Sequence, residues 1–491
     1  MKPVQERLRA FAALAPQALR RASPKLAWIS SERRRVFSWL LVLLACGVAW
    51  APLGAQQPRK SGALDSLIEA IRRRDDKAFA ALLAAKPGVD VVNGATPDGA
   101  TPLAFAIHLG ERRMAEALID AHADPNAADE YGETPVTLAA ANGDAVMIER
   151  LLAAGGDARA MRWNGETAVM IAAGAGSLDA VRALARRGAD VNAAEPRGGQ
   201  TALMWAAAEG HADVVTGLIE LGAKVDAASK TGFTPLVFAA VKDDAATIKT
   251  LLAAGANPSV KLRSGATPIL VAVQYRRSTA ARQLIDGGAD IGIRDRAGST
   301  MLHLAAQAGD LPLVKSLLAK GADANSRTPK SSAPAGARGG GGGRGVVAGE
   351  QTPLMVAARS DHEQVMRALV AAGADPTLKA QDGSTLLMAA ASGARLPTFK
   401  YAYEIDPSID AVTTAGNTVM HVAVGLNGRT QPEVCEVIQF LADHHAKLDE
   451  LNEAGRTPIA IADNLPVDLA VDLLTKLITA SGAKPKIPSK R

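Results

Sequence analysis

Cysteine and aromatic residues are scarce in this chain of 491 residues. One of its two cysteines, Cys46, lies in an apolar segment, and Cys435 stands alone. No disulfide can therefore form within residues 56–491, and this cysteine usage is compatible with any cellular compartment. Phe, Trp and Tyr together make up only 3% of the residues. Any aromatic side chain that the fold exposes is therefore informative.

Sequence motifs for common chemistries are also missing. No phosphate-binding Gly-x-x-x-x-Gly-Lys-[Ser/Thr] occurs, and the glycine run at 339–343 lacks the following lysine and helix start. There is no His-Glu-x-x-His and no paired-cysteine motif for zinc. The sequence thus predicts no catalytic residues, no cofactor and no metal site, and we expect the protein not to be an enzyme.

The basic charge of the chain is confined to its N-terminus. Of 55 Lys and Arg and 50 Asp and Glu, residues 1–55 hold nine and two. Residues 56–491 therefore carry 55 − 9 = 46 basic and 50 − 2 = 48 acidic side chains, a net charge of −2. A surface of this balance has no general attraction for phosphate backbones. We therefore expect no nucleic-acid partner.

An export signal is predicted near the N-terminus. A basic leader (1–35), which could also be an over-called start, precedes an apolar run and a small-residue exit (36–55). A basic flank, about 15 apolar residues and small residues are typical of a secretory signal peptide, here with cleavage after Ala55. An uncleaved anchor and a lipoprotein through Cys46 remain alternatives. In each case residues beyond 55 lie outside the cytoplasm, in the periplasm or secreted, and contact the membrane only through an uncleaved 36–55.

The rest of the chain repeats one phrase, of which residues 232–240 (Gly-Phe-Thr-Pro-Leu-Val-Phe-Ala-Ala) are a clear copy. Its threonine returns at 101, 134, 167, 201, 234, 267, 300, 352, 385, 418 and 457. Most of the steps are 33 residues, and the two long ones mark insertions after residues 325 and 424. The period and the Thr-Pro-Leu-His-x-Ala character resemble the ankyrin repeat, over about residues 63–481.

This resemblance implies an all-α repeat solenoid of about 11–12 helix-turn-helix units with projecting turns. Within each unit, Thr-Pro opens a first helix, and a glycine twelve residues before the next threonine ends the second helix. His122 and His445 take that glycine's place in their units. The resulting organisation is a linker (56–62), an N-terminal capping repeat (63–92), repeats (93–325), a flexible Gly-rich loop (326–349), repeats with a C-terminal cap (350–481) and a basic tail (482–491).

Several large or titratable side chains are assigned to packing by their place in the repeat. Phe105, Trp205 and Phe238, four residues after the threonine, are expected in the core. His303 and His421 stand at the histidine of Thr-Pro-Leu-His, where the resemblance implies a local hydrogen bond that stiffens the turn. His211 and His362 fall in the turn between the two helices of a repeat, a usual position in ankyrin repeats, and His444-His445 is a lone pair at a helix end, for which a metal site is disfavoured.

A binding face is predicted along the turn tips and first helices, the concave side in ankyrin proteins. The position four residues before the threonine holds Trp163 and then cations in four consecutive repeats. Aromatic residues fall at three further variable positions. These side-chain types dominate interface hot spots. The alternative is that the cations are solvated surface and the aromatics fill local gaps. The predicted partner-binding residues are Tyr131, Trp163, Arg197, Lys230, Phe233, Arg263, Tyr275 and Arg296.

The sequence therefore favours an exported, monomeric, non-enzymatic ankyrin array of bacterial type that binds a protein bearing an acidic strip. A periplasmic accessory or stress-protective factor that stabilises one enzyme is the alternative. An enzyme with an unrecognised site is disfavoured, because the repeats consume every long segment.

Overall fold

The computed structural model describes residues 62–331, 349–425 and 427–485. Within these residues the chain forms 25 α-helices and no β-strand, apart from four isolated β-bridges. The predicted all-α repeat solenoid is thereby confirmed. The apolar segment 36–55, most of the Gly-rich loop and the end of the basic tail lie outside the described residues. Among the described helices, none has the length and apolar character needed to cross a membrane.

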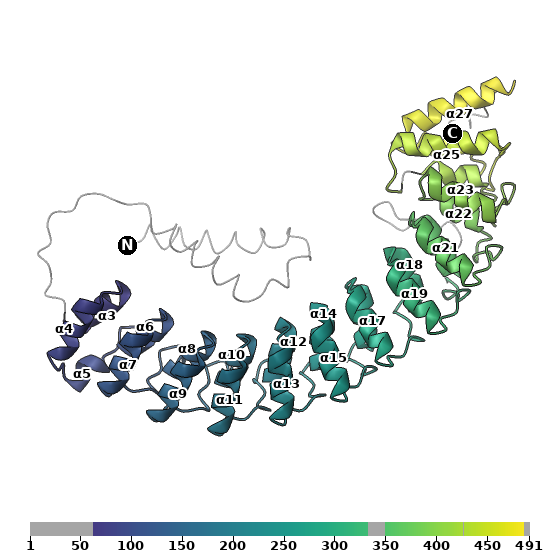
Figure 1. The fold of residues 1–491 in the computed structure, drawn as a ribbon. Coiled ribbons are helices and arrows are strands. Elements are labelled where there is room, and N and C mark those ends of the chain that lie inside the picture. The colour runs from purple at the N-terminus through teal and green to yellow at the C-terminus, as the bar shows by residue number, and fades with distance from the viewer. Residues whose placement is uncertain (1–61, 332–348, 426, 486–491) are drawn as a thin grey trace, which may run out of the picture. The chain divides into compact units, whose positions relative to one another are not determined.

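Eleven helix pairs follow an N-terminal group of three helices, and neighbouring pairs stack side by side (Figure 1). The N-terminal group is α3 (Ala63–Arg72), α4 (Asp76–Ala84) and α5 (Val89–Val92). The first helices of the pairs are α6 (Pro102–His108), α8 (Pro135–Ala141), α10 (Ala168–Gly174), α12 (Ala202–Glu209), α14 (Pro235–Lys242), α16 (Pro268–Gln274), α18 (Met301–Ala308), α20 (Pro353–Arg359), α22 (Leu386–Ala391), α24 (Val419–Ala423) and α26 (Pro458–Ala462). The second helices are α7 (Arg112–Asp120), α9 (Ala145–Ala153), α11 (Leu178–Arg186), α13 (Ala212–Glu220), α15 (Ala245–Ala253), α17 (Ser278–Asp286), α19 (Leu311–Ala319), α21 (Glu363–Ala371), α23 (Leu396–Ile405), α25 (Gln431–Asp443) and α27 (Asp468–Ala480).

Each first helix begins directly after the repeated threonine. In α6 the Thr101 hydroxyl accepts a hydrogen bond from the N–H of Ala104, and Pro102 occupies the first turn. A threonine cap satisfies one of the N–H groups that a helix leaves open, and proline costs nothing there. The predicted helix starts are therefore confirmed.

All second helices except α23 are followed by a left-handed residue, as the glycine spacing predicts. Gly222 and Gly255 have φ values of +86° and +87°. His122 and His445 take the same conformation, at +63° and +62°. Side chains with a Cβ adopt it only at some cost, so the packing of the helix ends imposes it in these two repeats.

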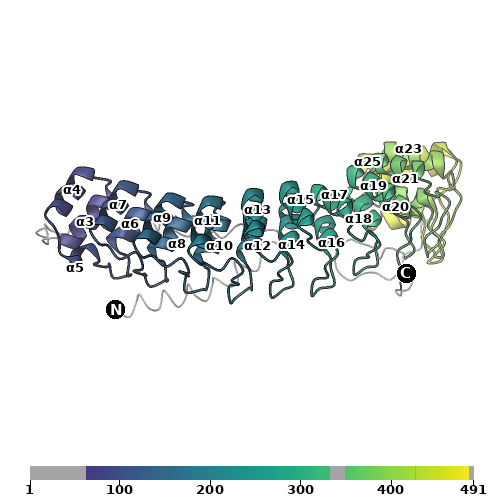
Figure 2. The same ribbon diagram turned by 60° about the horizontal axis from the view of Figure 1, so that its bottom comes forward.

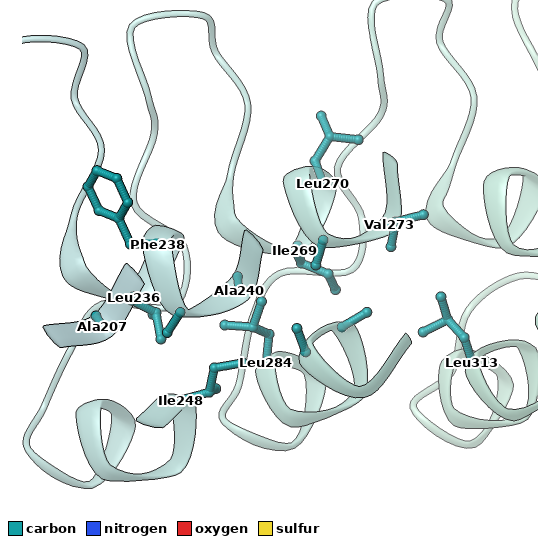
Figure 3. Packing of buried hydrophobic residues seen from close by; sticks show 14 of the residues in the cluster. Ala207, Leu236, Phe238, Ala240, Ile248, Ile269, Leu270, Val273, Leu284 and Leu313 are labelled. Atoms are coloured by element: carbon teal, nitrogen blue, oxygen red, sulfur yellow. The ribbon is translucent and has the colours of Figure 1, made fainter. Parts of the chain in front are cut away.

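The core runs between the two rows of helices without interruption from one pair to the next. Figure 3 shows Leu236 and Ala240 of α14 facing Ile248 of α15 and Leu284 of α17. Phe238 is buried, whereas Phe105 and Trp205 are half-buried and pack against the core. The expected packing role holds for all three. Small buried residues such as Ala239 and Ala240 let neighbouring first helices pack against each other.

The N-terminal group covers the exposed end of the first repeat. Leu67 and Ile71 of α3 are buried, and α3 packs against α6. The guanidinium of Arg72 lies 4.7 Å from the ring centre of Phe105. The other face, Arg73 to Lys77, is exposed. An apolar inner face and a charged outer face are what an end repeat requires.

Two irregularities break the period. At the Gly-rich insertion, the side-chain amide of Gln381 bonds the backbone of Ser331 at 2.6 and 3.0 Å, while the N–H of Gln381 donates to the carbonyl of Gly349. Both ends of the insertion are thus held at one residue. In the longer turn between α24 and α25, buried Arg429 donates to the carbonyls of Ala394, Ala423 and Gly425.

Candidate functional site

The loops between repeats project from one side of the helix rows as a series of tips (Figure 2). A glycine two residues before the repeated threonine makes the tight bend, for example Gly132 with φ +73° and Gly232 with φ +85°, except before Thr352, where Glu350 takes φ +58°. A polar side chain organises the bend, as where Asp129 accepts from the N–H groups of Tyr131 and Glu133 at 2.9 and 2.8 Å. The tips are therefore ordered turns and can present side chains in fixed positions.

Backbone hydrogen bonds tie neighbouring tips together. At six junctions the N–H four residues before the threonine donates to the carbonyl three residues before the preceding threonine. The donor–acceptor pairs are Glu130–Asp98, Trp163–Tyr131, Lys230–Gly198, Gln381–Gly349, Thr414–Asp382 and Glu453–Ala415, at 2.7 to 3.1 Å. Because these backbone groups are already paired, a partner must recognise the tip row mainly through side chains.

Tyr131 and Trp163 lie on two adjacent tips that such a bond joins, and they are 56% and 76% exposed. Their support is an ion-paired arginine. Arg162 contacts Glu133 of the preceding repeat at 2.7 Å and Glu166 of its own turn at 2.8 Å. Burial alone would lower the pKa of Arg162, but the two carboxylates outweigh it and raise that pKa. Arg162 thus remains charged and fixes the tip that carries Trp163.

Of the predicted cations, Lys230 forms a hydrogen bond to a neighbouring tip. Its ammonium donates to the carbonyl of Pro196, and it lies near buried Glu195. Burial would raise the pKa of Glu195, but hydrogen bonds from the N–H groups of Gln200, Gly198 and Arg197 outweigh it and lower that pKa. A charged carboxylate therefore lies beside Lys230 and compensates part of its charge. Arg197, on the same tip as Glu195, is exposed.

Arg263 and Arg296 are exposed on the next two tips, and no ion pair involves either within the described residues. The stem of Arg263 passes over the preceding tip, because a Cβ placed on Gly232 would lie 3.7 Å from its Cγ and 3.2 Å from its N. The structure thus brings the four predicted cations onto four successive tips but leaves them in different environments.

Two of the predicted aromatic residues do not join this row. Phe233 is half-buried and packs on Phe238 with ring centres 5.6 Å apart. Its ring belongs largely to the core, because the turn folds it inward against Val237 and Leu262. Tyr275, 54% exposed, is the C-cap of α16, at the end of the helix opposite the tip. The two ends of a first helix are about 10 Å apart, so a residue at the C-terminal end does not lie beside the tip that precedes the helix.

Sequence reasoning missed three exposed tip residues six positions before the threonine. These are Met161, which is 55% exposed beside Trp163, and the cations Lys261 and Arg294. The residue between Lys261 and Arg263, Leu262, is 5% exposed. Lys261 and Arg263 are thus both exposed, on either side of a buried residue. The signal available in the sequence was this alternation of exposed and buried residue types.

The described histidines serve the fold. In His303, Nδ1 accepts from the N–H of Thr300 at 3.3 Å and Nε2 donates to the carbonyl of Gln351 at 2.8 Å. His421 makes the same pair of bonds with Thr418 and Arg456. Each imidazole therefore caps its own helix, as expected, and also ties the next repeat. Burial lowers the pKa of both rings and keeps them neutral.

Other chemistry-bearing groups do not assemble into a reactive site within the described residues. No group of three or more His, Cys, Asp or Glu is placed there to hold a metal ion. A cavity of about 680 Å³ lies among α23, α25 and α27 and includes Cys435 and Phe440 in its lining. Burial raises the pKa of the Cys435 thiol, which disfavours the nucleophilic thiolate.

Comparison with known families agrees with this geometry. The family model for ankyrin repeats (3 copies) matches in overlapping sets at residues 67–159, 110–195, 137–229, 194–261 and 236–328. The ankyrin repeat model matches residues 349–381. No curated protein matches the chain. Ankyrin repeats generally mediate protein–protein interaction, and proteins built from them are typically non-enzymatic scaffolds. The matched residues cover more than half of the chain, which therefore belongs to the ankyrin repeat family.

Proposed function

We propose that this protein is an exported, non-enzymatic array that binds a partner protein along its tips and the adjoining first helices. The observation that carries the proposal is the exposure of Trp163, 76%, on a tip whose backbone and supporting Arg162 are fixed. A large aromatic side chain held in water without a packing role is a ready anchor for a pocket on a partner. Tyr131 and Met161 extend this apolar patch.

Charge defines the rest of the proposed surface. Beyond the apolar patch, the tips at Arg197, Lys230, Arg263 and Arg296 present cations. A partner with an acidic strip beside an apolar pocket is complementary to this order. Opposite charges at the rim of an interface mainly accelerate association, whereas a buried aromatic anchor slows dissociation. We further propose a monomeric array without a nucleic-acid partner.

The test is capture of a partner by the parent protein followed by kinetic comparison with Trp163→Ala. We expect the dissociation rate to rise by the equivalent of about 2 kcal/mol or more, roughly 30-fold. Val146→Ala is the matched control, since Val146 is 56% exposed on α9, away from the tips. Equal dissociation from Trp163→Ala and from the control would contradict the proposed surface.

Export is proposed from the sequence of residues 36–55, which lie outside the described residues. The basic flank and short apolar run support a cleaved signal, and the mature chain should begin near Gln56. N-terminal sequencing of protein purified from its native cell checks this. Recovery of intact cytoplasmic protein beginning at or before Arg35 would contradict export.

A further inference from the structure

Four cations gather on two neighbouring tips in the middle of the array. Lys261 and Arg263 lie on one tip, and Arg294 and Arg296 lie on the next; we name these four residues the cationic quartet. All four are exposed. Within each tip the two cations are separated by a single residue, and packed repeats are about 8–10 Å apart. The quartet is therefore a compact two-by-two arrangement.

The charge of the quartet is not neutralised by ion pairing within the described residues. The guanidinium of Arg294 donates to two neutral backbone carbonyls, those of Gly298 at 2.7 Å and Arg327 at 2.9 Å. The carboxylate in the same tip, Asp295, accepts from the N–H groups of Ala297 and Ser299 at 2.9 and 2.8 Å. It is thus hydrogen-bonded within its own turn, and its single negative charge stands against the four cations of the two tips.

Some cations elsewhere in the array are paired within the protein. Arginines on second helices pair with carboxylates of neighbouring repeats, as Arg186 does with Glu149 at 2.7 Å and Arg182 with Glu220 at 3.3 Å. Among the tips, Lys230 bonds Pro196 and lies near Glu195. Lysines and arginines without an ion pair also occur elsewhere among the described residues, as at Lys249 and Arg282, but the quartet gathers four such cations on two adjacent tips and leaves positive charge available to a ligand.

The backbone of the tips that carry the quartet is also held in place. Leu262, between the two cations of the first tip, is anchored in a cluster with Val237 and Val271. Arg263 is seated over Gly232, as described above. The residues after each cation pair, Ser264 and Ala297, are small and leave the approach open. Little backbone ordering remains to be done on binding, which favours affinity.

We infer that the cationic quartet is the main electrostatic subsite of the array and takes a peptide segment with two closely spaced pairs of carboxylates. This inference rests on the proposed protein-binding function and relocates its electrostatic centre from Arg197 and Lys230 to residues 261–296. Three of the four cations are arginines, whose planar guanidinium suits bidentate contact with carboxylates. The quartet occupies only two tips, which is too short for the long phosphate tracking of nucleic-acid grooves.

The experiment measures binding of synthetic peptides to the full-length chain. One peptide carries four Glu in a single block of five residues, and a second has the same composition with the four Glu spread over twenty residues. The test variant is Lys261→Gln/Arg263→Gln/Arg296→Gln; Arg294 is kept because it bonds two carbonyls. The control Lys249→Gln/Arg282→Gln/Lys315→Gln removes the same charge from exposed positions on α15, α17 and α19.

We expect the parent and the control to bind the block peptide at least fivefold more tightly than the spread peptide. The test variant should lose at least tenfold in affinity for the block peptide at low salt and most of its salt dependence. Equal loss in the control, or no binding by the parent, would overturn the inference. Tighter binding of a phosphoserine version or of an oligo-dT strand would overturn the assigned ligand class.

Failure of this inference can be told apart from failure of the proposed function. A captured protein partner that is released by Trp163→Ala but bound equally by the triple variant and the parent would leave the proposed function standing and remove the quartet. If block-peptide binding depends on the quartet but Trp163→Ala has no effect on the captured partner, the quartet stands and the proposed surface at Trp163 is removed.

Discussion

The central repeats and the last three repeats build the same helix pairs by different means. In α12–α19 every second helix has nine residues and ends in a left-handed glycine or in the equivalent turn. In α22–α27 the second helices have 10, 13 and 13 residues. The family models match residues 67–328, which include the central repeats, and residues 349–381.

In the last repeats, a buried polar group replaces the left-handed turn after α23, whereas α25 and α27 are still followed by left-handed residues, His445 and Gly482. After α23, buried Asp406 ends the helix and accepts from the N–H of Leu387 at 2.9 Å. Phe440 stacks with His444 at 4.0 Å and meets Tyr403 and Phe399 edge-on. The comparison teaches that the helix-pair architecture needs satisfied turns and a filled core, but not one particular residue for either.

The largest expected effect tests the dependence of the last repeats on a buried cation. Arg429→Met removes the donor for three backbone carbonyls, which burial then leaves without a partner. Burial lowers the pKa of Arg429 to about 10, so the side chain is still charged at neutral pH. We expect a loss of about 3 kcal/mol in the free energy of unfolding, measured by urea denaturation. Arg367→Met, at an exposed pair with Glu363, is the control and should destabilise the protein much less.

Substitution of a tip glycine should destabilise different repeats to different extents. A Cβ on Gly132 would lie 2.8 Å from the N of Trp163, whereas one on Gly383 would have Val412 O nearest at 3.6 Å. Both glycines have positive φ, +73° and +79°. Gly383→Ala should therefore cost about 1 kcal/mol through backbone strain alone, and Gly132→Ala about 2 kcal/mol because a neighbouring tip must also move. Equal costs by thermal denaturation would show that tip contacts do not contribute to stability.

Acidification should affect both regions through one histidine each. Burial lowers the pKa of His303 and His421 in the folded protein below 6.5. The two histidines therefore contribute fully to the free energy of unfolding only at pH values above the pKa of the unfolded state. This contribution is lost as the pH falls through 6.5 toward and below the folded pKa. The free energy of unfolding should fall between pH 7 and pH 5, and less steeply in His303→Gln/His421→Gln. The control variant His122→Asn, at an exposed site, should lose free energy of unfolding with falling pH in parallel with the parent. An equally steep loss in the double variant would contradict the assignment to His303 and His421.

The smallest effect is expected at the boundary between the two regions. Replacing the insertion 332–348 by a short Gly-Ser linker should leave the melting temperature almost unchanged. Gln381 already holds both ends of the insertion, and each halving of a flexible loop changes its closure entropy by only about 0.6 kcal/mol. Circular dichroism on heating measures the outcome, and a large loss of helicity would mean that the segment contributes to packing.

The sequence by itself determined the repeat period, the helix starts at threonine and most helix ends at glycine. These features are local, because a cap or a left-handed turn involves residues within a few positions of each other. The positions of Trp163 and of the cations on the tips also followed from the period alone. So did the helix-capping role of His303, which needs only Thr300 three residues before it.

Only the tertiary structure decided which of those tip residues are available to a partner. Phe233 turned inward onto Phe238, Lys230 bonded Pro196 of the preceding tip, and Arg162 paired with Glu133. Lys261 joined Arg263 on one tip, on either side of the buried Leu262, and Arg294 joined Arg296 on the next tip. The partners of these side chains often lie about one repeat away in the sequence. A periodic pattern fixes where a side chain stands, whereas stacking of neighbouring repeats fixes what it meets.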